Sequence, residues 1–229
     1  MAYAALIFDL FGTLVAFSAR AHDQVLDAMA AALDAPAREF GGAWSAVYLA
    51  QEQGLTTEAA LQQLCDGLGT FPTADHLAGA SQLYRDFQQR TLTPRPDAIP
   101  LLTSVRQMGY ATGLISNCPA LVADLWPASP LAPLIDVAIF SSRVGVRKPD
   151  PRIYQLACEQ LGNAAERCLF VGDGSSREVS GAAACGMDAV LPRPDDEDPD
   201  DAQRLGRQQW SGRAIRRLSE IPALLSQVA

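Results

Sequence analysis

Five short runs of hydrophobic residues are distributed along the chain. They are rich in β-branched or aromatic residues and span residues 4–8, 111–116, 137–140, 168–172 and 188–191. Most of these runs are continuously apolar, which is typical of strands that are covered on both faces. We therefore expect five buried strands.

Clear start and stop signals bound the helices that lie between these runs. Asp150 can cap a helix whose first residue is Pro151, and Gly162 ends it. Residues 176–185, which precede Gly186, show a similar pattern, and the serines at their start are able to cap it. Strand and helix repeated in this order predict an α/β fold with a doubly wound parallel sheet.

One long interval, residues 16 to about 92, has no strand pattern. Instead, apolar residues recur at helical spacing in four successive stripes. The stripes contain Val25, Met29 and Leu33; Trp44, Val47 and Tyr48; Leu61 and Leu64; and Leu77, Ala80, Tyr84 and Phe87. We predict an α/β core made of residues 1–15 and 93–229, interrupted by a helical insertion at residues 16–92.

The composition predicts a soluble protein of the cytoplasm. The chain has 229 residues, of which 48% are hydrophobic, so it can bury a full-sized core. Its apolar start carries Asp9, turns at Gly12 and has no basic leader, which argues against a signal peptide or a membrane anchor. The cysteines are odd in number and form no CxxC pair, so we expect reduced thiols. They are Cys65, Cys118, Cys158, Cys168 and Cys185.

The formal net charge of −8 narrows the range of partners. It predicts no general attraction for nucleic acid or anionic lipid, so an anionic substrate needs local positive charge. Only two histidines are present, His22 and His76, which leaves most of any chemistry to carboxylates. The acidic stretch 192–201 is interpreted as a solvated loop, balanced by the arginines at 204, 207, 213, 216 and 217.

Reactive side chains gather near the ends of four predicted strands, where open α/β sheets bind their ligands. They are Asp9, Ser116, Asn117, Lys148, Asp173 and Glu178. Taken singly, each is an ordinary turn, loop or cap residue, and Glu178 suits a helix N-terminus as well as a metal site. Together, two aspartates and a lysine meet the needs of phosphoryl transfer: oxygen ligands for magnesium, an attacking carboxylate and positive charge for the equatorial oxygens.

Four segments, in this order and spacing, resemble the motifs of the haloacid dehalogenase-like hydrolase superfamily. They read FDLFGTL, ISN, KPDPRIY and VGDGSSREVSGAAACGM, and the resemblance runs from about residue 3 to residue 191. It implies a Rossmann-like core, with the helical insertion as a C1-type cap over the active site. It also implies a magnesium-dependent hydrolase that acts on a small phosphorylated molecule.

The resemblance further implies roles for individual residues. Asp9 would be the nucleophile and would form an aspartyl-phosphate. Ser116 would bind the transferred phosphoryl group, Lys148 would steady its charge, and Asn117 is able to bond a phosphate oxygen beside them.

The metal site implied by the resemblance combines residues of the first and the fourth motif. Asp9, the backbone carbonyl of Phe11 and Asp173 would hold magnesium. Glu178, at the second acidic position of the family, would support the metal through water or hydrogen bonds.

The sequence departs from the family at Phe11. Family phosphatases carry a second aspartate there, which protonates the leaving group, and such catalysis typically contributes a factor of about 10² to 10⁴ in rate. Three interpretations remain: a phosphatase that uses water, a cap residue or an easy leaving group; a 2-haloacid dehalogenase; and a non-catalytic binding protein. Dehalogenases need no such acid but generally lack a carboxylate in the place of Asp173, so we favour the phosphatase.

The sequence does not predict the substrate or the oligomeric state. Within the insertion, Arg20, Arg38, Trp44 and Tyr48 are candidates for substrate contact by residue type alone. Surface charges and aromatic residues of the helical core are the simpler interpretation of all four.

Overall fold

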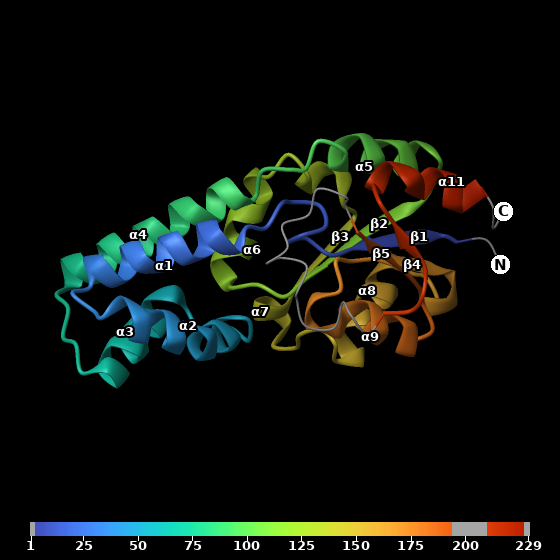
Figure 1. Ribbon diagram of the computed structural model, residues 1–229. Helices are drawn as coiled ribbons and strands as arrows, with labels where there is room; N and C mark the ends of the chain where they lie inside the picture. Colours follow the sequence, from blue (N-terminus) through green and yellow to red (C-terminus); the bar gives the residue numbers. More distant parts are fainter. Residues whose placement is uncertain (1–2, 194–209, 227–229) are drawn as a thin grey trace.

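The computed structural model describes residues 3–193 and 210–226, which form a six-stranded sheet with helices on both faces and a group of four helices beside it (Figure 1). From residue 194 on, the predicted loop at 192–201 lies outside the described residues, as do the arginines at 204 and 207. No described helix is long and apolar enough to cross a membrane.

All six strands of the sheet are parallel, in the order β3-β2-β1-β4-β5-β6. Their bounds are β1 Ala5–Phe8, β2 Ala111–Ser116, β3 Val137–Phe140, β4 Cys168–Val171, β5 Asp188–Pro192 and β6 Ala214–Ile215. The five predicted strands are confirmed to within one residue at each end, and β6 is an addition. The loops after β1 and β4 leave adjacent strands toward opposite sides, and such a switch point is where open α/β sheets bind ligands.

Different helices cover the two faces of the sheet. One face carries α5 (Ala98–Gln107) and α11 (Ile221–Ser226), the other α8 (Pro151–Leu161) and α9 (Glu178–Ala184), with the short α6 (Ala120–Leu125) and α7 (Ser141–Val144) after β2 and β3. Leu6 and Phe8 of β1 point into the first layer, and Ala5 and Ile7 point into the second. Burial on both sides explains the continuous apolar run of this strand.

The limits of α8 were predicted correctly, whereas the start of α9 was not. Asp150 caps α8 by accepting a hydrogen bond from the backbone two residues on, and Gly162 ends it with a φ of 66°. By contrast, α9 begins at Glu178 rather than at residue 176, because Ser176 and Arg177 both have positive φ. No serine side chain caps this helix.

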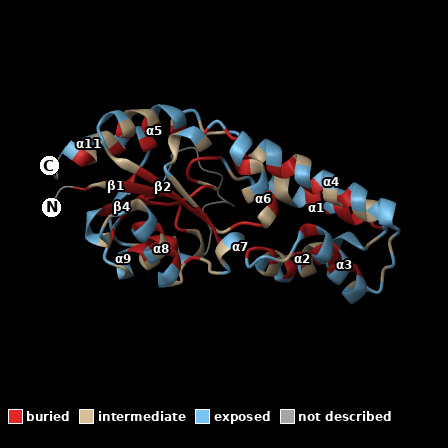
Figure 2. Cartoon of the chain, turned by 180° about the vertical axis from the view of Figure 1, so that it is seen from behind, coloured by how far each residue is buried: buried red, intermediate tan, exposed pale blue. Residues whose placement is uncertain are grey.

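The predicted helical insertion is a group of four helices with a hydrophobic core of its own. They are α1 (Ala19–Ala32), α2 (Ala37–Gln51), α3 (Thr57–Leu68) and α4 (Ala74–Thr91). Ser18, Thr56 and Thr73 cap three of them with their side chains. The buried residues of these helices form one hydrophobic cluster, as the four predicted stripes require, and Figure 2 marks them in red along the helices. The division of the chain into two domains at residues 16 and 92 stays a prediction.

Two helical glycines carry opposite expectations for replacement by alanine. At Gly181 in α9, an added Cβ would lie 2.7 Å from Tyr154 Oη and 2.9 Å from Pro149 Cβ. Overpacking costs about 1–3 kcal/mol, more than the roughly 1 kcal/mol that alanine gains over glycine in a helix. At Gly79 in α4, nothing lies within 4 Å of the added Cβ, so only the gain remains.

We therefore expect Gly181→Ala to lower the urea midpoint of unfolding and Gly79→Ala to raise it. A raised midpoint in Gly181→Ala would contradict the close packing of α9 on Tyr154 and Pro149, and a lowered midpoint in Gly79→Ala would contradict the open space at that position.

Candidate active site

The loops that follow β1 and β4 bring two aspartates to one point on the edge of the sheet. Phe8 and Val171 are partners in register, and the Asp9 backbone N–H donates to the Val171 carbonyl at 2.9 Å. Asp173 follows Val171 by two residues, and both carboxylates are buried, with 4% of Asp9 and 2% of Asp173 exposed. The sheet topology itself therefore places Asp9 beside Asp173.

Lys148, the only lysine in the sequence, is buried in the middle of the site. Its Nζ donates to Asp9 Oδ1 and to Glu178 Oε2, both at 2.5 Å, and to the Ile115 carbonyl at 2.9 Å. Burial opposes the charge of this ammonium group, but the two carboxylates outweigh it and raise the pKa of Lys148 above its ordinary value. Burial also raises the pKa of Glu178, as does the neighbouring Asp9, and Lys148 opposes this only in part.

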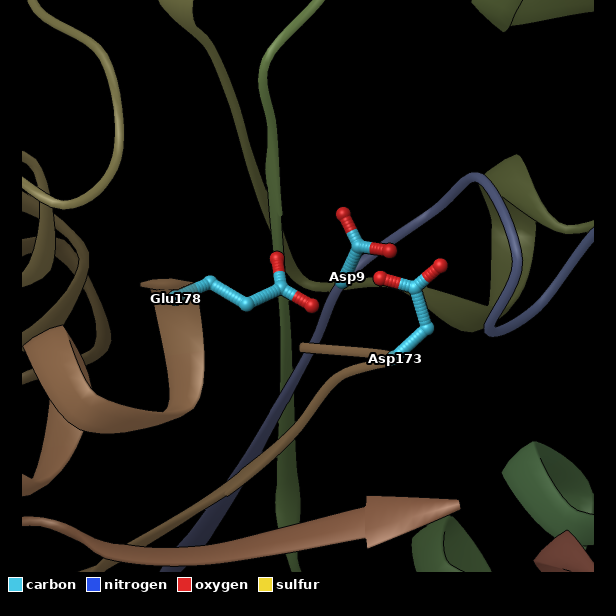
Figure 3. A group of neighbouring side chains, drawn as sticks. All are labelled: Asp9, Asp173 and Glu178. Atoms are coloured by element: carbon cyan, nitrogen blue, oxygen red, sulfur yellow. The ribbon is translucent and has the colours of Figure 1, made fainter. Parts of the chain in front are cut away.

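Three carboxyl groups converge beside this lysine. Asp9, Asp173 and Glu178 each offer an oxygen within 4.8 Å of the others, and Figure 3 shows the three side chains reaching toward a common centre from β1, from the loop after β4 and from α9. Glu178 Oε1 accepts from the Gly174 N–H at 3.1 Å, and Asp173 Oδ1 accepts from the Ser175 N–H at 2.8 Å. These carboxylates, rather than serine hydroxyls, bind the backbone amides that precede α9.

The donor set of this cluster fits a divalent cation. Three carboxylates and one ammonium group leave a formal net charge of −2 among these buried groups. Buried charge without compensation is costly, and hard carboxylate oxygens are the ligands that magnesium prefers. The residues present therefore fit magnesium, with Asp9, Asp173 and Glu178 as the oxygen donors.

Ser116 and Asn117 lie at the end of β2, as predicted, but they differ in their contacts. Asn117 Nδ2 donates to the Lys148 carbonyl at 3.0 Å, and Asn117 Oδ1 accepts from the Lys148 N–H at 2.8 Å. This pair of bonds fixes the loop that carries the lysine. Ser116 Oγ is buried beside the Cys118 thiol and makes no hydrogen bond of ordinary geometry to any described residue. A ligand oxygen would satisfy this hydroxyl, which otherwise costs roughly 1–3 kcal/mol.

A cavity of about 310 Å³ lies between this edge of the sheet and the four helices. The sheet side contributes Asp9, Phe11, Asn117, Lys148, Ser175 and Ser176. The helical side contributes Phe17, His22, Trp44, Ser45, Tyr48, Glu52, Phe87, Gln88 and Thr91. Of the four residues singled out in the insertion, Trp44 and Tyr48 line the cavity, whereas Arg20 and Arg38 are exposed on the surface.

Sequence reasoning missed an ion pair that joins the four-helix group to the loop that carries Lys148. Arg147 Nε donates to Glu52 Oε2 at 2.6 Å, and Glu52 is only 4% exposed. Burial raises the pKa of Glu52, and Arg147 and Lys148 oppose the rise only in part. The two residues are 95 positions apart, so no local pattern could have paired them.

A second missed contact lies within the first motif. Thr13 Oγ1 donates to Asp9 Oδ2 at 3.0 Å, so each carboxylate oxygen of Asp9 has a hydrogen-bond donor, Thr13 on one and Lys148 on the other. The spacing of four residues within FDLFGTL could have suggested this bond.

Because Lys148 is the only lysine, its burial can be measured by chemical labelling. A protonated amine that is held by two carboxylates does not react with acetic anhydride, so we expect modification only at the rate at which the site opens. Mass spectrometry of the peptide that carries Lys148 reports this rate. Glu178→Gln removes one ion pair and should speed the reaction. Labelling of the native wild type as fast as of the urea-unfolded chain would contradict the buried ion pairs.

A profile of haloacid dehalogenase-like hydrolases matches residues 3–186. A phosphatase of Mycobacterium tuberculosis (strain CDC 1551 / Oshkosh) is 32% identical over 199 residues, which cover 83% of this chain and 88% of that protein. (S)-2-haloacid dehalogenase 1 of Pseudomonas sp. (strain CBS-3) is 27% identical over 231 residues, covering 96% of each chain. The crystal structure of a 2-haloacid dehalogenase from Pseudomonas syringae pv. Tomato DC3000 has the same fold, with a TM-score of 0.72, 22% identity, and coverage of 99% of this chain and 100% of that one. The chain belongs to the haloacid dehalogenase-like hydrolase family.

Proposed function

We propose that this hydrolase is a magnesium-dependent phosphatase of a small phosphorylated molecule, with Asp9 as its nucleophile. One observation carries the proposal: the buried carboxylates of Asp9, Asp173 and Glu178 converge beside Lys148, and Asp9 and Lys148 line a cavity. The phosphatase from Mycobacterium tuberculosis, which matches most of this chain, supports the same activity.

The proposed reaction has two displacements at phosphorus. An oxygen of Asp9 forms a bond to phosphorus while the bond to the alcohol oxygen breaks, which gives an aspartyl-phosphate and the alcohol as its anion, and this anion then takes a proton from water. Water then attacks the same phosphorus, which releases phosphate and restores Asp9. Thr13 and Lys148 hold the carboxylate of Asp9 in place through both steps.

Other groups in the site would bind the phosphoryl group and the metal. The Ser116 hydroxyl and the Lys148 ammonium group would bind equatorial oxygens of the phosphoryl group. Asp9, the carbonyl of Phe11 and Asp173 would hold magnesium, with Glu178 supporting it. When bound, the metal offsets the negative charge that Asp9 meets as it approaches phosphorus.

We also propose that the helices of residues 16–92 act as a cap over this site. They form more than half of the cavity wall, and the pair of Glu52 and Arg147 ties α2 to the loop that carries Lys148. A closed cap excludes water and strengthens the electrostatic interactions beneath it.

A dehalogenase remains the second candidate, because Phe11 replaces the acid of the phosphatases and a dehalogenase matches 96% of the chain. In that reaction Asp9 attacks carbon, halide leaves, and no leaving-group acid is required. The three-carboxylate cluster has no use in such a reaction. Magnesium-independent release of halide from a 2-haloacid would therefore replace the phosphatase assignment, and absence of both activities would favour a binding protein.

Replacing Asp173 tests the metal site. We expect Asp173→Asn to weaken magnesium binding by at least about tenfold, because a charged oxygen ligand is lost from a buried cluster. Isothermal titration calorimetry measures the affinity, and phosphate release measures activity on the same samples. Asp75→Asn, which removes an exposed charge from α4, is the matched control. Unchanged magnesium affinity in Asp173→Asn would remove the metal assignment.

The side chain of Phe11 leads to a second prediction, which concerns the leaving group of the substrate. Since Phe11 cannot protonate the departing oxygen, kcat/KM should fall steeply as the pKa of the leaving alcohol rises, with acyl and aryl phosphates far ahead of alkyl phosphates. Phe11→Asp should flatten this dependence and help alkyl phosphates selectively. A series of phosphate esters of graded leaving-group pKa measures both slopes. A shallow slope in the wild type would show that another group already supplies the proton.

A further inference from the structure

Aromatic rings dominate the part of the cavity that lies beyond the carboxylates. Five of them, beside His22, line it: Phe11, Phe17, Trp44, Tyr48 and Phe87. His22 lies between Phe17 and Phe87, with ring centroids 6.0 Å from each. Trp44 and Phe87 are buried and the other three rings are half-buried, so all five offer apolar surface to a ligand in the cavity.

This aromatic wall is held rigidly from behind. Tyr84 is fully buried, and its ring packs against Trp44 at 5.1 Å and against Phe87 at 6.3 Å between centroids. Phe40 also stacks on Trp44, with ring centroids 5.9 Å apart. A wall fixed in this way loses little freedom when a flat ligand packs against it.

The charges around the cavity disfavour a second anionic group on the ligand. Lys148 is already paired with Asp9 and Glu178, and Arg147 is paired with Glu52. Burial lowers the pKa of His22, which favours the neutral imidazole. Among the described residues that line the cavity, no cation is left for a carboxylate or a second phosphate.

Glu52 adds a second unfavourable factor, because its own carboxylate already occupies Arg147. It is the only carboxylate that the described part of the helical unit contributes to the cavity, and its exposed fraction is 4%. In a buried place a like charge costs far more than it would in water.

We propose that the substrate is the monophosphate of an uncharged aromatic alcohol, whose ring packs against the aromatic wall while Glu52 excludes alcohols that carry a second negative charge. The proposal rests on the phosphatase function proposed above. A cavity of about 310 Å³ is at the lower end of the usual size of ligand pockets, which suits a small flat group. It also agrees with Phe11, because a phenolate leaves without the help of an acid.

Two phosphates with leaving groups of similar acidity separate the effect of charge from the effect of leaving ability. They are phenyl phosphate and 4-carboxyphenyl phosphate, and only the second carries an extra negative charge. We expect kcat/KM to be about tenfold or more lower for the carboxylated substrate, mainly through KM. Glu52→Gln should reduce this ratio severalfold, whereas Glu58→Gln, which removes an exposed charge from α3, should leave it unchanged.

The aromatic wall is tested by the ratio of phenyl phosphate to acetyl phosphate, a small substrate without a ring. Phe17→Ala should lower the ratio of their kcat/KM values by about tenfold, through a higher KM for phenyl phosphate. Phe71→Ala removes a ring that is 88% exposed on the same helical unit and lies outside the described cavity lining, so it should not change the ratio.

Acetyl phosphate also distinguishes the two ways in which the account can fail. If the wild type does not hydrolyse it in an Asp9-dependent manner, the phosphatase function fails. If the wild type hydrolyses it but turns over 4-carboxyphenyl phosphate as well as phenyl phosphate, or if Phe17→Ala leaves the ratio unchanged, the substrate inference alone is overturned.

Discussion

The burial of a single ammonium group organises this molecule. Lys148 lies in an apolar interior, where a charge is tolerated only when it is paired and hydrogen-bonded. Asp9 and Glu178 supply the pairing, and they come from the end of β1 and the start of α9. The lysine therefore ties together segments that are far apart in the sequence. Since Asp173 adds a third carboxylate, the cluster keeps an excess of negative charge that a divalent cation can balance.

The two sides of the cavity differ in chemical character and suit different parts of a substrate. The edge of the sheet is polar and charged, and it suits a phosphoryl group. The helical side carries most of the aromatic rings, together with a few polar residues and Glu52, whose carboxylate is paired with Arg147. Because Arg147 directly precedes Lys148 in the chain, the same loop supports the chemistry on one side and contacts the helices on the other. In the proposed function, phosphoryl transfer and the choice of alcohol would thus be physically coupled.

Much of this arrangement could be predicted from the sequence, for identifiable reasons. Continuous apolar runs fix buried strands, and parallel strands bring Asp9 and Asp173 to one edge. The two-residue strand β6 gives no periodicity, so it could not be found. The prediction placed the start of α9 too early. Residues just before Glu178 have left-handed φ, and the Glu178 carboxylate, not a serine hydroxyl, binds the Gly174 amide. The pair of Glu52 and Arg147 depends on how the helices lie on the sheet, which no local pattern encodes.

The central claim is that Asp9 attacks phosphorus, and oxygen isotopes test it most directly. A single turnover of phenyl phosphate with excess enzyme and magnesium in H₂¹⁸O, quenched in acid, gives the Asp9 peptide and the released phosphate for mass spectrometry. Attack at phosphorus predicts a transient phosphoryl group on Asp9, ¹⁸O in the phosphate and none in the peptide. A phosphoryl group on another residue, or ¹⁸O in the Asp9 carboxylate as expected for hydrolysis of a carbon ester, would contradict the account.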